Sequence, residues 1–238
     1  MAGVWLILPT YNEAENVEAI VAAALPQLES TGLDHRILVV DDGSPDGTGE
    51  IADRLAGEHA SVEVLHRTRK EGIGPAYLAG FAHALEGGAD LVMEMDSDFS
   101  HDPADIPRLV AAASEADLVI GSRYVDGGGV TDWGVGRRLI SRGGSLYARL
   151  LLGVPVRDLT AGFKCFRRSA LETLDLSEVG TDGYGFQIEV TYRALRAGLR
   201  VKEIPILFRD RRVGASKMSA RIALEAFWKV PLLRLRVR

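Results

Sequence analysis

Two aspartates, Asp96 and Asp98, follow directly on the apolar run at residues 91–95. If the chain stays extended there, residues two apart point to the same side, so both carboxylates face one point. Two carboxylates that close repel each other unless a cation lies between them, and such oxygen ligands suit Mg²⁺ or Mn²⁺. Ser100 and His101 come next and could complete the shell. The alternative is a solvated turn that caps the following helix, but the position after a strand, near other polar clusters, favours a metal site.

A second acidic cluster, Asp41 and Asp42, follows the apolar run at residues 37–40. Residues 43–48, Gly-Ser-Pro-Asp-Gly-Thr, indicate a turn and a helix N-cap, because these residue types dominate turns and satisfy free N–H groups at helix starts. A turn does not explain two carboxylates directly after a strand, where one can accept hydrogen bonds from ribose hydroxyls or base N–H groups. We therefore expect one of the two to bind a nucleotide.

The first apolar run ends in residues 9–13, Pro-Thr-Tyr-Asn-Glu, where a dinucleotide-binding Rossmann protein carries Gly-x-Gly-x-x-Gly. That spacing occurs nowhere in the chain, which argues against a nicotinamide enzyme. The signatures of P-loop NTPases, zincins and serine hydrolases are missing as well. The five histidines are scattered, and we expect each to have an ordinary surface or core role.

Basic residues gather in the second half of the chain, and each alone is most simply a solvated surface charge. Residues 214–217, Gly-Ala-Ser-Lys, suggest a loop that closes cations and backbone donors over a phosphate-rich ligand. The basic candidates are Arg123, Arg137, Arg138, Arg142, Arg211, Arg212 and Lys217.

The elements that must position these residues alternate in the first half of the chain. Short β-rich runs separated by helical patterns of about 10–15 residues predict βαβ units on a parallel sheet, and hence an α/β fold. Ligands of such sheets bind beyond the carboxyl ends of the strands, so the polar clusters are expected to converge on one edge. The predicted strands are residues 4–8, 37–40, 62–66, 91–95 and 118–120, and the predicted helices are residues 13–28, 48–57, 75–86 and 104–113.

Past Gly121 the alternation stops. With neither a linker nor a repeat, this half is expected to complete the same domain. The predicted elements are a Gly-rich loop at residues 127–129, a helix at 141–152, a hairpin near 161–166, a helix near 186–197 and a strand at 200–206.

Composition bounds the class of protein. The chain has 238 residues, of which 47% are apolar and 26% charged, so it can bury a normal core and is not intrinsically disordered. The single cysteine, Cys165, cannot form an internal disulfide, which indicates a reducing, cytosolic setting. We expect neither a leader nor a spanning helix, because no window approaches the roughly 18 consecutive apolar residues required. The net charge of −5 argues against general nucleic-acid binding.

Positive charge is concentrated at the C-terminus. Residues 209–238 carry nine Lys or Arg against Asp210 and Glu225, a local charge of +7 that leaves −12 for the rest of the chain. From Arg221 onwards basic residues interleave with apolar ones, and Pro231 is expected to kink the segment. This composition fits an interfacial helix on an anionic membrane. A terminal helix packed on the domain is the alternative.

Read in order, the motifs resemble those of the polyprenol (dolichol) monophosphate mannose synthases, which are inverting glycosyltransferases of family 2 with the GT-A fold. The similarity extends from about residue 6 to residue 217. The early motifs mark the superfamily, whereas the later Arg, Ser-Arg-Gly and Ser-Lys motifs narrow the match to the dolichol-phosphate sugar synthases. The motifs are PTYNE (9–13), DDGSPDGT (41–48), GIG (72–74), DSDFSH (96–101), GSRY (121–124), ISRG (140–143), DLTAGF (158–163) and GASK (214–217).

The resemblance implies a GT-A fold with a nucleotide-binding, Rossmann-like first half, and a role for each matching residue. Guanosine contacts are implied for Pro9, Tyr11, Glu13, Val40 and Asp42. A divalent cation, Mg²⁺ or Mn²⁺, is implied at Asp96 and Asp98, with Ser97 lining the site and Ser100 as a further ligand, directly or through water. Contacts to the donor diphosphate or the acceptor phosphate are implied for Arg123, Arg138, Arg211 and Lys217. Asp98, Arg123, Arg211 and Lys217 are the implied catalytic residues.

The implied activity is transfer of mannose from GDP-mannose to a polyprenyl monophosphate, giving polyprenyl phosphate mannose for membrane mannosyltransferases. Residues 1–218 would form the catalytic domain and residues 219–238 a basic amphipathic segment. Some relatives continue into membrane helices, whereas this chain stops at Arg238. We therefore expect peripheral association with the cytoplasmic face of a membrane, through the tail or a membrane-anchoring partner protein.

Two other functions fit the same residues. A UDP-glucose-dependent polyprenyl-phosphate glucosyltransferase would use the same metal and phosphate groups. A non-catalytic nucleotide-sugar-binding module would bind metal at Asp96 and Asp98, while the basic loop serves a partner protein.

Overall fold

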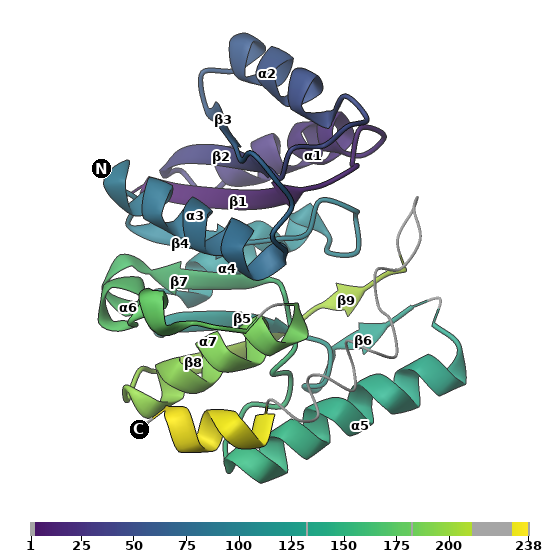
Figure 1. The fold of residues 1–238 in the computed structure, drawn as a ribbon, viewed down its shortest axis with the longest axis vertical. Coiled ribbons are helices and arrows are strands. Elements are labelled where there is room, and N and C mark those ends of the chain that lie inside the picture. Colours follow the sequence, from purple (N-terminus) through teal and green to yellow (C-terminus); the bar gives the residue numbers. More distant parts are fainter. Residues whose placement is uncertain (1–2, 132, 182, 211–229, 238) are drawn as a thin grey trace.

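The structure is a computed structural model that describes residues 3–237 except 132, 182 and 211–229. At its centre is a seven-stranded sheet of order β3-β2-β1-β4-β7-β5-β8 (Figure 1). Its neighbouring strands are parallel except at β7, which runs antiparallel to both β4 and β5. The strands are β1 (Gly3–Thr10), β2 (Asp34–Asp41), β3 (Val62–His66), β4 (Leu91–Glu94), β5 (Leu118–Ser122), β7 (Lys164–Arg167) and β8 (Val201–Pro205); β6 (Gly129–Val130) and β9 (Leu207–Phe208) form a separate parallel pair.

Helices cover both faces of the sheet, because successive strand side chains point to opposite faces. In β1, Leu6 and Leu8 pack in the core with α1, α2 and α4, whereas Trp5 and Ile7 pack in the core with α3, α5 and α7. The α/β prediction, a mostly parallel sheet flanked by helices, is confirmed. The helices are α1 (Val17–Glu29), α2 (Thr48–Glu58), α3 (Ile73–Glu86), α4 (Ile106–Ala112), α5 (Val135–Leu152), α6 (Arg168–Thr173) and α7 (Tyr184–Arg196), with 3-10 turns at Pro103–Asp105 and Leu176–Glu178.

The predicted hairpin near residues 161–166 is wrong. A single strand, β7, inserts between β4 and β5, so both of its partners come from earlier in the chain. Local sequence carries no signal for such distant pairing. The helix predicted at 13–28 begins only at Val17, after a turn at the polar edge, and the one predicted at 141–152 begins already at Val135.

The end of the chain packs on the domain. Residues 230–236 are helical, and Arg234 donates from Nη1 to the main-chain oxygen of Leu151 on α5 at 2.9 Å. Leu232 and Leu235 on the outer side are exposed. The packed alternative therefore describes residues 230–237, and contact of their outer side with a membrane stays a prediction. The buried residues here are Val230, Leu233 and Val237.

Two further expectations concern redox state and the membrane. Cys165 on β7 is fully buried, and burial raises the pKa of its thiol to about 12, so the free cysteine is unreactive. None of the helices within the described ranges combines the length and apolarity needed to cross a bilayer.

Candidate active site

Three polar clusters meet where β2, β1 and β4, which are neighbours in the sheet, end. Thr10 Oγ1 donates to Asp41 Oδ1 at 3.2 Å, which joins the ends of β1 and β2. Ser97 Oγ donates to the main-chain oxygen of Pro9 at 3.1 Å, which joins the ends of β1 and β4. The predicted convergence on one edge is confirmed, and Figure 1 shows these strand ends pointing to the side where β6, β9 and α5 lie.

The loops of this edge hold backbone strain. Among the described residues other than glycine, only Asn12 and Phe99 have positive φ, at 57° and 61°. Such conformations cost roughly 1–3 kcal/mol each and persist where the surroundings fix them, most often at binding sites. Asn12 is held through its N–H, which donates to Ser44 Oγ at 3.0 Å. Both strained positions therefore mark the loops that carry the predicted nucleotide and metal residues.

The two aspartates of the predicted metal site differ in exposure. Asp98 is buried and its Oδ1 accepts the N–H of Ser100 at 3.0 Å, whereas the Asp96 side chain is 27% exposed. The Ser100 hydroxyl is buried with no hydrogen-bond partner in the described part of the chain, so it has an oxygen to offer a cation or a water. Opposite Asp96, a Cβ on Gly162 would lie 3.8 Å from both Asp96 oxygens.

His101 connects this pair to the second half of the protein. Its Nδ1 accepts the N–H of Asp96 at 3.3 Å, and its ring packs against Phe163 and Phe208, each at 5.2 Å between centroids. Burial lowers the pKa of His101 to about 4, so the imidazole is neutral at pH 7 and keeps Nδ1 as an acceptor. The centre of the Phe208 ring also lies 5.3 Å from the guanidinium carbon of Arg123, so Arg123 lies near the loop that carries the aspartate pair.

The nucleotide end, by which we mean the part of the edge formed by the ends of β2 and β3 with the predicted nucleotide residue Asp42, contains a cation that the sequence analysis missed. Arg67, directly after β3, donates from Nη1 to Asp42 Oδ1 and from Nη2 to Glu71 Oε2. The Lys70 ammonium lies 4.0 Å from the centre of the Tyr11 ring. The rule that pointed to Asp41 and Asp42, polar residues at the carboxyl end of a strand, applies equally to Arg67 at the end of the next strand in the sheet.

The other residues with an implied guanosine contact lie at the same edge. Glu13 is buried, its N–H donates to Thr48 Oγ1 at 3.0 Å, and its Oε2 accepts from Asn16 Nδ2 at 2.8 Å. Pro9 and Val40 pair in the β1–β2 ladder, and the Val40 side chain is fully buried.

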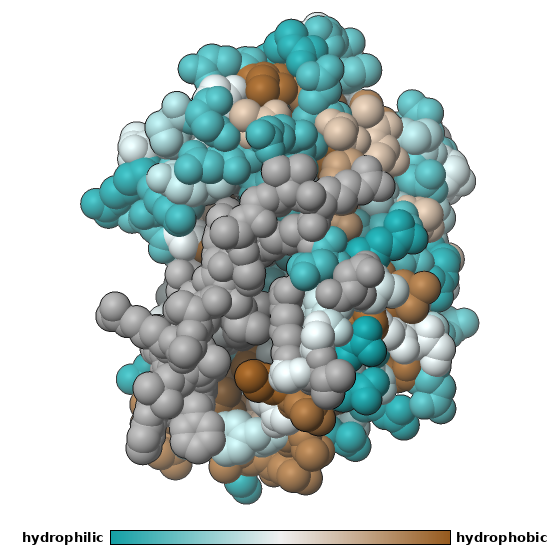
Figure 2. Space-filling model, turned by 90° about the vertical axis from the view of Figure 1, so that its right-hand side faces the viewer, coloured by the Kyte–Doolittle hydropathy of each residue, from teal (hydrophilic) through white to brown (hydrophobic). Residues whose placement is uncertain are grey.

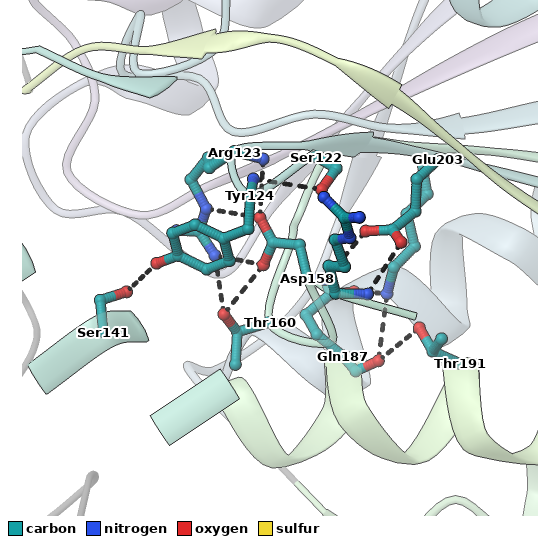
Figure 3. A network of polar contacts seen from close by, with 11 residues as sticks. Ser122, Arg123, Tyr124, Ser141, Asp158, Thr160, Gln187, Thr191 and Glu203 are labelled. Atoms are coloured by element: carbon teal, nitrogen blue, oxygen red, sulfur yellow. Dashed lines mark hydrogen bonds and ion pairs between the residues drawn. The ribbon is translucent and has the colours of Figure 1, made fainter. Parts of the chain in front are cut away.

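Arg123 follows β5 and is already ion-paired. Figure 3 shows its guanidinium against Asp158, with Nε to Oδ2 and Nη2 to Oδ1 both at 2.7 Å. Both side chains are buried. Burial alone would raise the pKa of Asp158, but the Arg123 cation and its hydrogen bonds outweigh this and lower it, so the pair is charged. Because Asp158 compensates its charge, Arg123 contributes fixed hydrogen-bond direction more than net positive charge.

Two further ionisable side chains, Glu94 and Lys164, are buried in the sheet, and neither carboxylate oxygen of Glu94 has a hydrogen-bond partner in the described part of the chain. Glu94 on β4 faces Lys164 on β7 across the antiparallel ladder, and both side chains are fully buried. The Lys164 ammonium donates to the side-chain and main-chain oxygens of Gln187 on α7. Burial raises the pKa of Glu94 and lowers that of Lys164, and each charge opposes the other's shift. Charged residues inside strands otherwise apolar were the sequence signal for this pair.

The remaining basic candidates are placed only in part. Arg138 is exposed on α5. Arg211, Arg212 and Lys217 lie outside the described residues. The last described residues before that segment lie against the loop that follows Asp98. The N–H of Arg209 donates to the main-chain oxygen of Ser100 at 3.0 Å, and Arg209 Nη2 lies 3.4 Å from Asp102 Oδ2.

The α/β fold with polar clusters at the carboxyl ends of its strands is typical of nucleotide-binding enzymes, and comparison with known proteins gives the family. Residues 5–175 match the model of glycosyl transferase family 2, and the chain belongs to this family. It is 49% identical over 220 residues to the undecaprenyl-phosphate mannosyltransferase of Micrococcus luteus, covering 92% of this chain and 89% of that protein. It is also 49% identical over 230 residues to the polyprenol monophosphomannose synthase of Mycolicibacterium smegmatis, covering 94% and 84%. The resemblance drawn from the motifs is thereby confirmed, and the protein is a glycosyltransferase.

Solved structures agree on the fold. The glucosyl-3-phosphoglycerate synthase of Mycobacterium tuberculosis in complex with phosphoglyceric acid is 22% identical, with a TM-score of 0.74, all of this chain covered and 81% of that one. Its complex with Mn²⁺, UDP and glucosyl-3-phosphoglycerate is 23% identical, with a TM-score of 0.73 and the same coverage. This likeness confirms the GT-A fold.

Proposed function

We propose that the protein transfers a mannosyl group from GDP-mannose to a polyprenyl monophosphate, with inversion at the anomeric carbon and with Mg²⁺ or Mn²⁺ bound. The observation that carries the proposal is the 49% identity, over more than nine-tenths of the chain, to enzymes named for mannose transfer to this class of lipid. The non-catalytic alternative has no observation in its favour, because this is a glycosyltransferase with its polar clusters assembled at one edge.

The reaction is foremost a problem of charge. The acceptor phosphate and the donor diphosphate each carry about two negative charges, and at about 5 Å and an effective dielectric of about 20 they repel by roughly 13 kcal/mol. The acceptor oxygen is already ionised at neutral pH, so no general base is needed and direct in-line displacement follows. Because Asp158 neutralises Arg123, the positive charge falls to the cation and to the basic residues that follow Arg209, among them Arg211 and Lys217.

The residues present fit a divalent cation. Asp96 and Asp98 supply carboxylate oxygens and Ser100 an unpaired buried hydroxyl. No three His, Cys, Asp or Glu side chains in the described ranges are arranged to hold an ion by themselves. Mg²⁺ usually keeps several waters and binds through one or two carboxylates together with substrate phosphates. When bound, such a cation screens the phosphates and stabilises charge on the departing diphosphate.

Guanine suits the nucleotide end. Its adjacent N–H donors match a carboxylate and its O6 and N7 acceptors match an arginine, whereas uracil has a single ring N–H. Asp42 and Arg67 present a carboxylate and a guanidinium side by side. Thr10 and Ser44 engage both oxygens of Asp41, whereas the hydrogen bond from Arg67 engages only Oδ1 of Asp42 within the described residues, so we assign the base contact to Asp42 together with Arg67.

Replacing Arg67 by Gln is expected to raise the KM for GDP-mannose about tenfold with little change in kcat, because a hydrogen bond to a charged group contributes about 1.5–3 kcal/mol. Steady-state kinetics at varied donor concentration measure this. Arg54→Gln is the matched control, since Arg54 also joins two carboxylates, Glu18 and Glu58, the latter four residues along the chain like Glu71 from Arg67. An unchanged KM in Arg67→Gln would remove Arg67 from base recognition.

The function itself is tested by incubating the protein with Mg²⁺ or Mn²⁺, a short polyprenyl phosphate and either labelled GDP-mannose or labelled UDP-glucose. Formation of labelled polyprenyl phosphate mannose supports the proposal. Transfer from UDP-glucose alone would favour the glucosyltransferase, and absence of transfer from both donors would contradict both.

A lipid acceptor must be met at a membrane surface, and α5 offers a face for it. Figure 2 looks onto the edge where the strands end and shows hydrophobic surface gathering at the lower end of the molecule, where α5 lies. The helix carries four arginines and no acidic residue, so its charge complements an anionic membrane. Its exposed apolar residues are Leu139, Ile140, Leu146 and Leu150.

We expect the double substitution Leu139→Gln and Leu146→Gln to weaken binding to anionic phospholipid vesicles at least about tenfold, because each leucine withdrawn from water contributes about 1.5–3 kcal/mol. Vesicle co-sedimentation at fixed ionic strength measures the change. Leu207→Gln on β9, which is also exposed, serves as the control. Equal binding of all three proteins would move the membrane contact away from α5.

A further inference from the structure

We infer that Asp158 is a positioning residue for Arg123 and that Glu203 holds Asp158 in place in turn. Together Asp158 and Glu203 fix the direction in which the Arg123 guanidinium faces the phosphates. The inference rests on the proposed role of Arg123 at the reacting groups. Neither Asp158 nor Glu203 belongs to the residues implied above to touch the donor, the acceptor or the cation.

One carboxylate fixes both the main chain and the side chain of Arg123. Asp158 Oδ2 accepts the main-chain N–H of Arg123 at 3.0 Å as well as its Nε at 2.7 Å. Nη2 donates to Asp158 Oδ1 and to Thr160 Oγ1, each at 2.7 Å (Figure 3). The Nε–Nη2 edge of the planar guanidinium is thereby occupied, and a phosphate must approach Arg123 from another side.

Aromatic rings restrict the guanidinium further. Its carbon lies 5.2 Å from the centre of the Tyr124 ring, 5.3 Å from that of Phe208 and 6.0 Å from that of Trp133. Phe208 also packs edge-on against His101, whose Nδ1 accepts the N–H of Asp96. Phe208 therefore contacts both the Arg123 guanidinium and His101, which is hydrogen-bonded to Asp96. Through this ring, Arg123 and the predicted cation site are packed against the same group of side chains.

Glu203 fixes the loop that carries Asp158. Its Oε2 accepts the N–H of Arg157 at 2.8 Å and its Oε1 accepts the N–H of Asp158 at 2.9 Å. Glu203 lies on β8, opposite Ile120 in the parallel ladder with β5, and β5 leads directly into Arg123. The same strand pair thus places the arginine and, through Glu203, the carboxylate that orients it.

This arrangement suits a reaction whose transition state must be met by donors already in place. Hydrogen bonds fixed before reaction stabilise developing charge without reorganisation, and a small misplacement of such a group reduces the rate strongly. An arginine anchored on one edge loses little freedom when a phosphate binds, so the anchor acts on turnover more than on donor affinity.

A matched ion pair elsewhere in the protein provides the control. Asp117, directly before β5, accepts the main-chain N–H, Nε and Nη2 of Arg200, directly before β8, at 2.9, 3.2 and 2.9 Å. The pattern of three bonds is the same as between Asp158 and Arg123, but it lies at the opposite end of the two strands. Asp117→Asn therefore removes an equivalent charge without touching the site.

The experiment compares kcat and donor KM for Asp158→Asn, Glu203→Gln, Arg123→Ala and the double variant Arg123→Ala/Asp158→Asn, with thermal melting of each. We expect Asp158→Asn to lower kcat about tenfold or more while donor KM changes less than about threefold. Glu203→Gln should lower kcat by a smaller factor in the same direction, and it provides the readout if Asp158→Asn fails to fold. Asp117→Asn should retain kcat within about twofold.

The double variant decides whether Asp158 acts through Arg123. If it does, kcat of the double variant equals that of Arg123→Ala, because no arginine is left to position. If Asp158→Asn lowers kcat by the same factor in the wild-type protein and in Arg123→Ala, the inference is overturned while the proposed function stands. Unchanged kcat in both Asp158→Asn and Glu203→Gln would have the same consequence. Near-normal turnover of Arg123→Ala would overturn it together with the proposed role of Arg123.

Discussion

Asp98→Asn should abolish sugar transfer, lowering kcat by at least about a thousandfold, while the protein stays folded. The substitution keeps the shape of the buried side chain and removes one of the two carboxylates that we propose as ligands of the cation. A cation at this pair contributes several kcal/mol of charge stabilisation, and about 1.4 kcal/mol corresponds to a factor of ten in rate.

Thermal melting gives a readout that does not depend on turnover. In the wild-type protein, Mn²⁺ at about a hundred times its dissociation constant should stabilise the fold by about 2.7 kcal/mol, which raises Tm by several degrees. The rise should vanish in Asp98→Asn. Asp90→Asn, at the opposite end of β4, should keep both the activity and the rise, because the Asp90 carboxylate accepts the N–H of Gly3, away from the strand ends that carry the site. Near-normal activity of Asp98→Asn would end the metal assignment.

Arg123→Ala should lower kcat about a hundredfold or more and raise donor KM much less. Removing one fixed donor to a developing anion costs about 10²–10³ in turnover in comparable sites. The split between kcat and KM matters, because a group that only bound the ground state would change KM alone.

The same substitution leaves Asp158 buried without its cation, so a fall in Tm is expected alongside the kinetic effect. Assays therefore need to run well below the new Tm. Arg200→Ala, which breaks the equivalent pair with Asp117, should lower kcat less than twofold. An unchanged rate in Arg123→Ala would reassign this arginine to a structural role.

The first half of the fold could be predicted because each of its strands and helices has a signal in its own stretch of sequence. An apolar run followed by Asp-x-Asp, or by Asp-Asp-Gly, specifies a strand, its end and the polar edge at once, and parallel pairing then brings those ends together. This pattern predicted Asp96, Asp98 and one of Asp41 and Asp42 as site residues, and the resemblance to the family then selected Asp42.

The second half could not be predicted in the same way, because its contacts are between distant residues. The sequence around Lys164 contains no signal that this residue pairs with Glu94, seventy residues earlier, in the β4–β7 ladder. Similarly, Arg123 was recognisable as a basic residue near the site, but its pairing with Asp158 depends on β7 lying between β4 and β5. Arg67 was missed for a different reason: its signal was present and was not applied to the third strand.

The reversed direction of β7 has a consequence for how the two sides of the reaction centre can vary. The neighbouring strands β4 and β5 end at the edge that carries the candidate site, whereas β7 begins at that edge. Asp158 and Thr160 therefore lie in the chain segment that precedes β7. Arg123 lies at the start of the connection between β5 and β7, and Asp158 and Thr160 lie at its end. The stretch between them can therefore change in length while Arg123 stays attached to β5 and Asp158 stays attached to Glu203 on β8. Acceptor lipids of different shape could be accommodated by remodelling that connection alone, while the nucleotide half stays as it is.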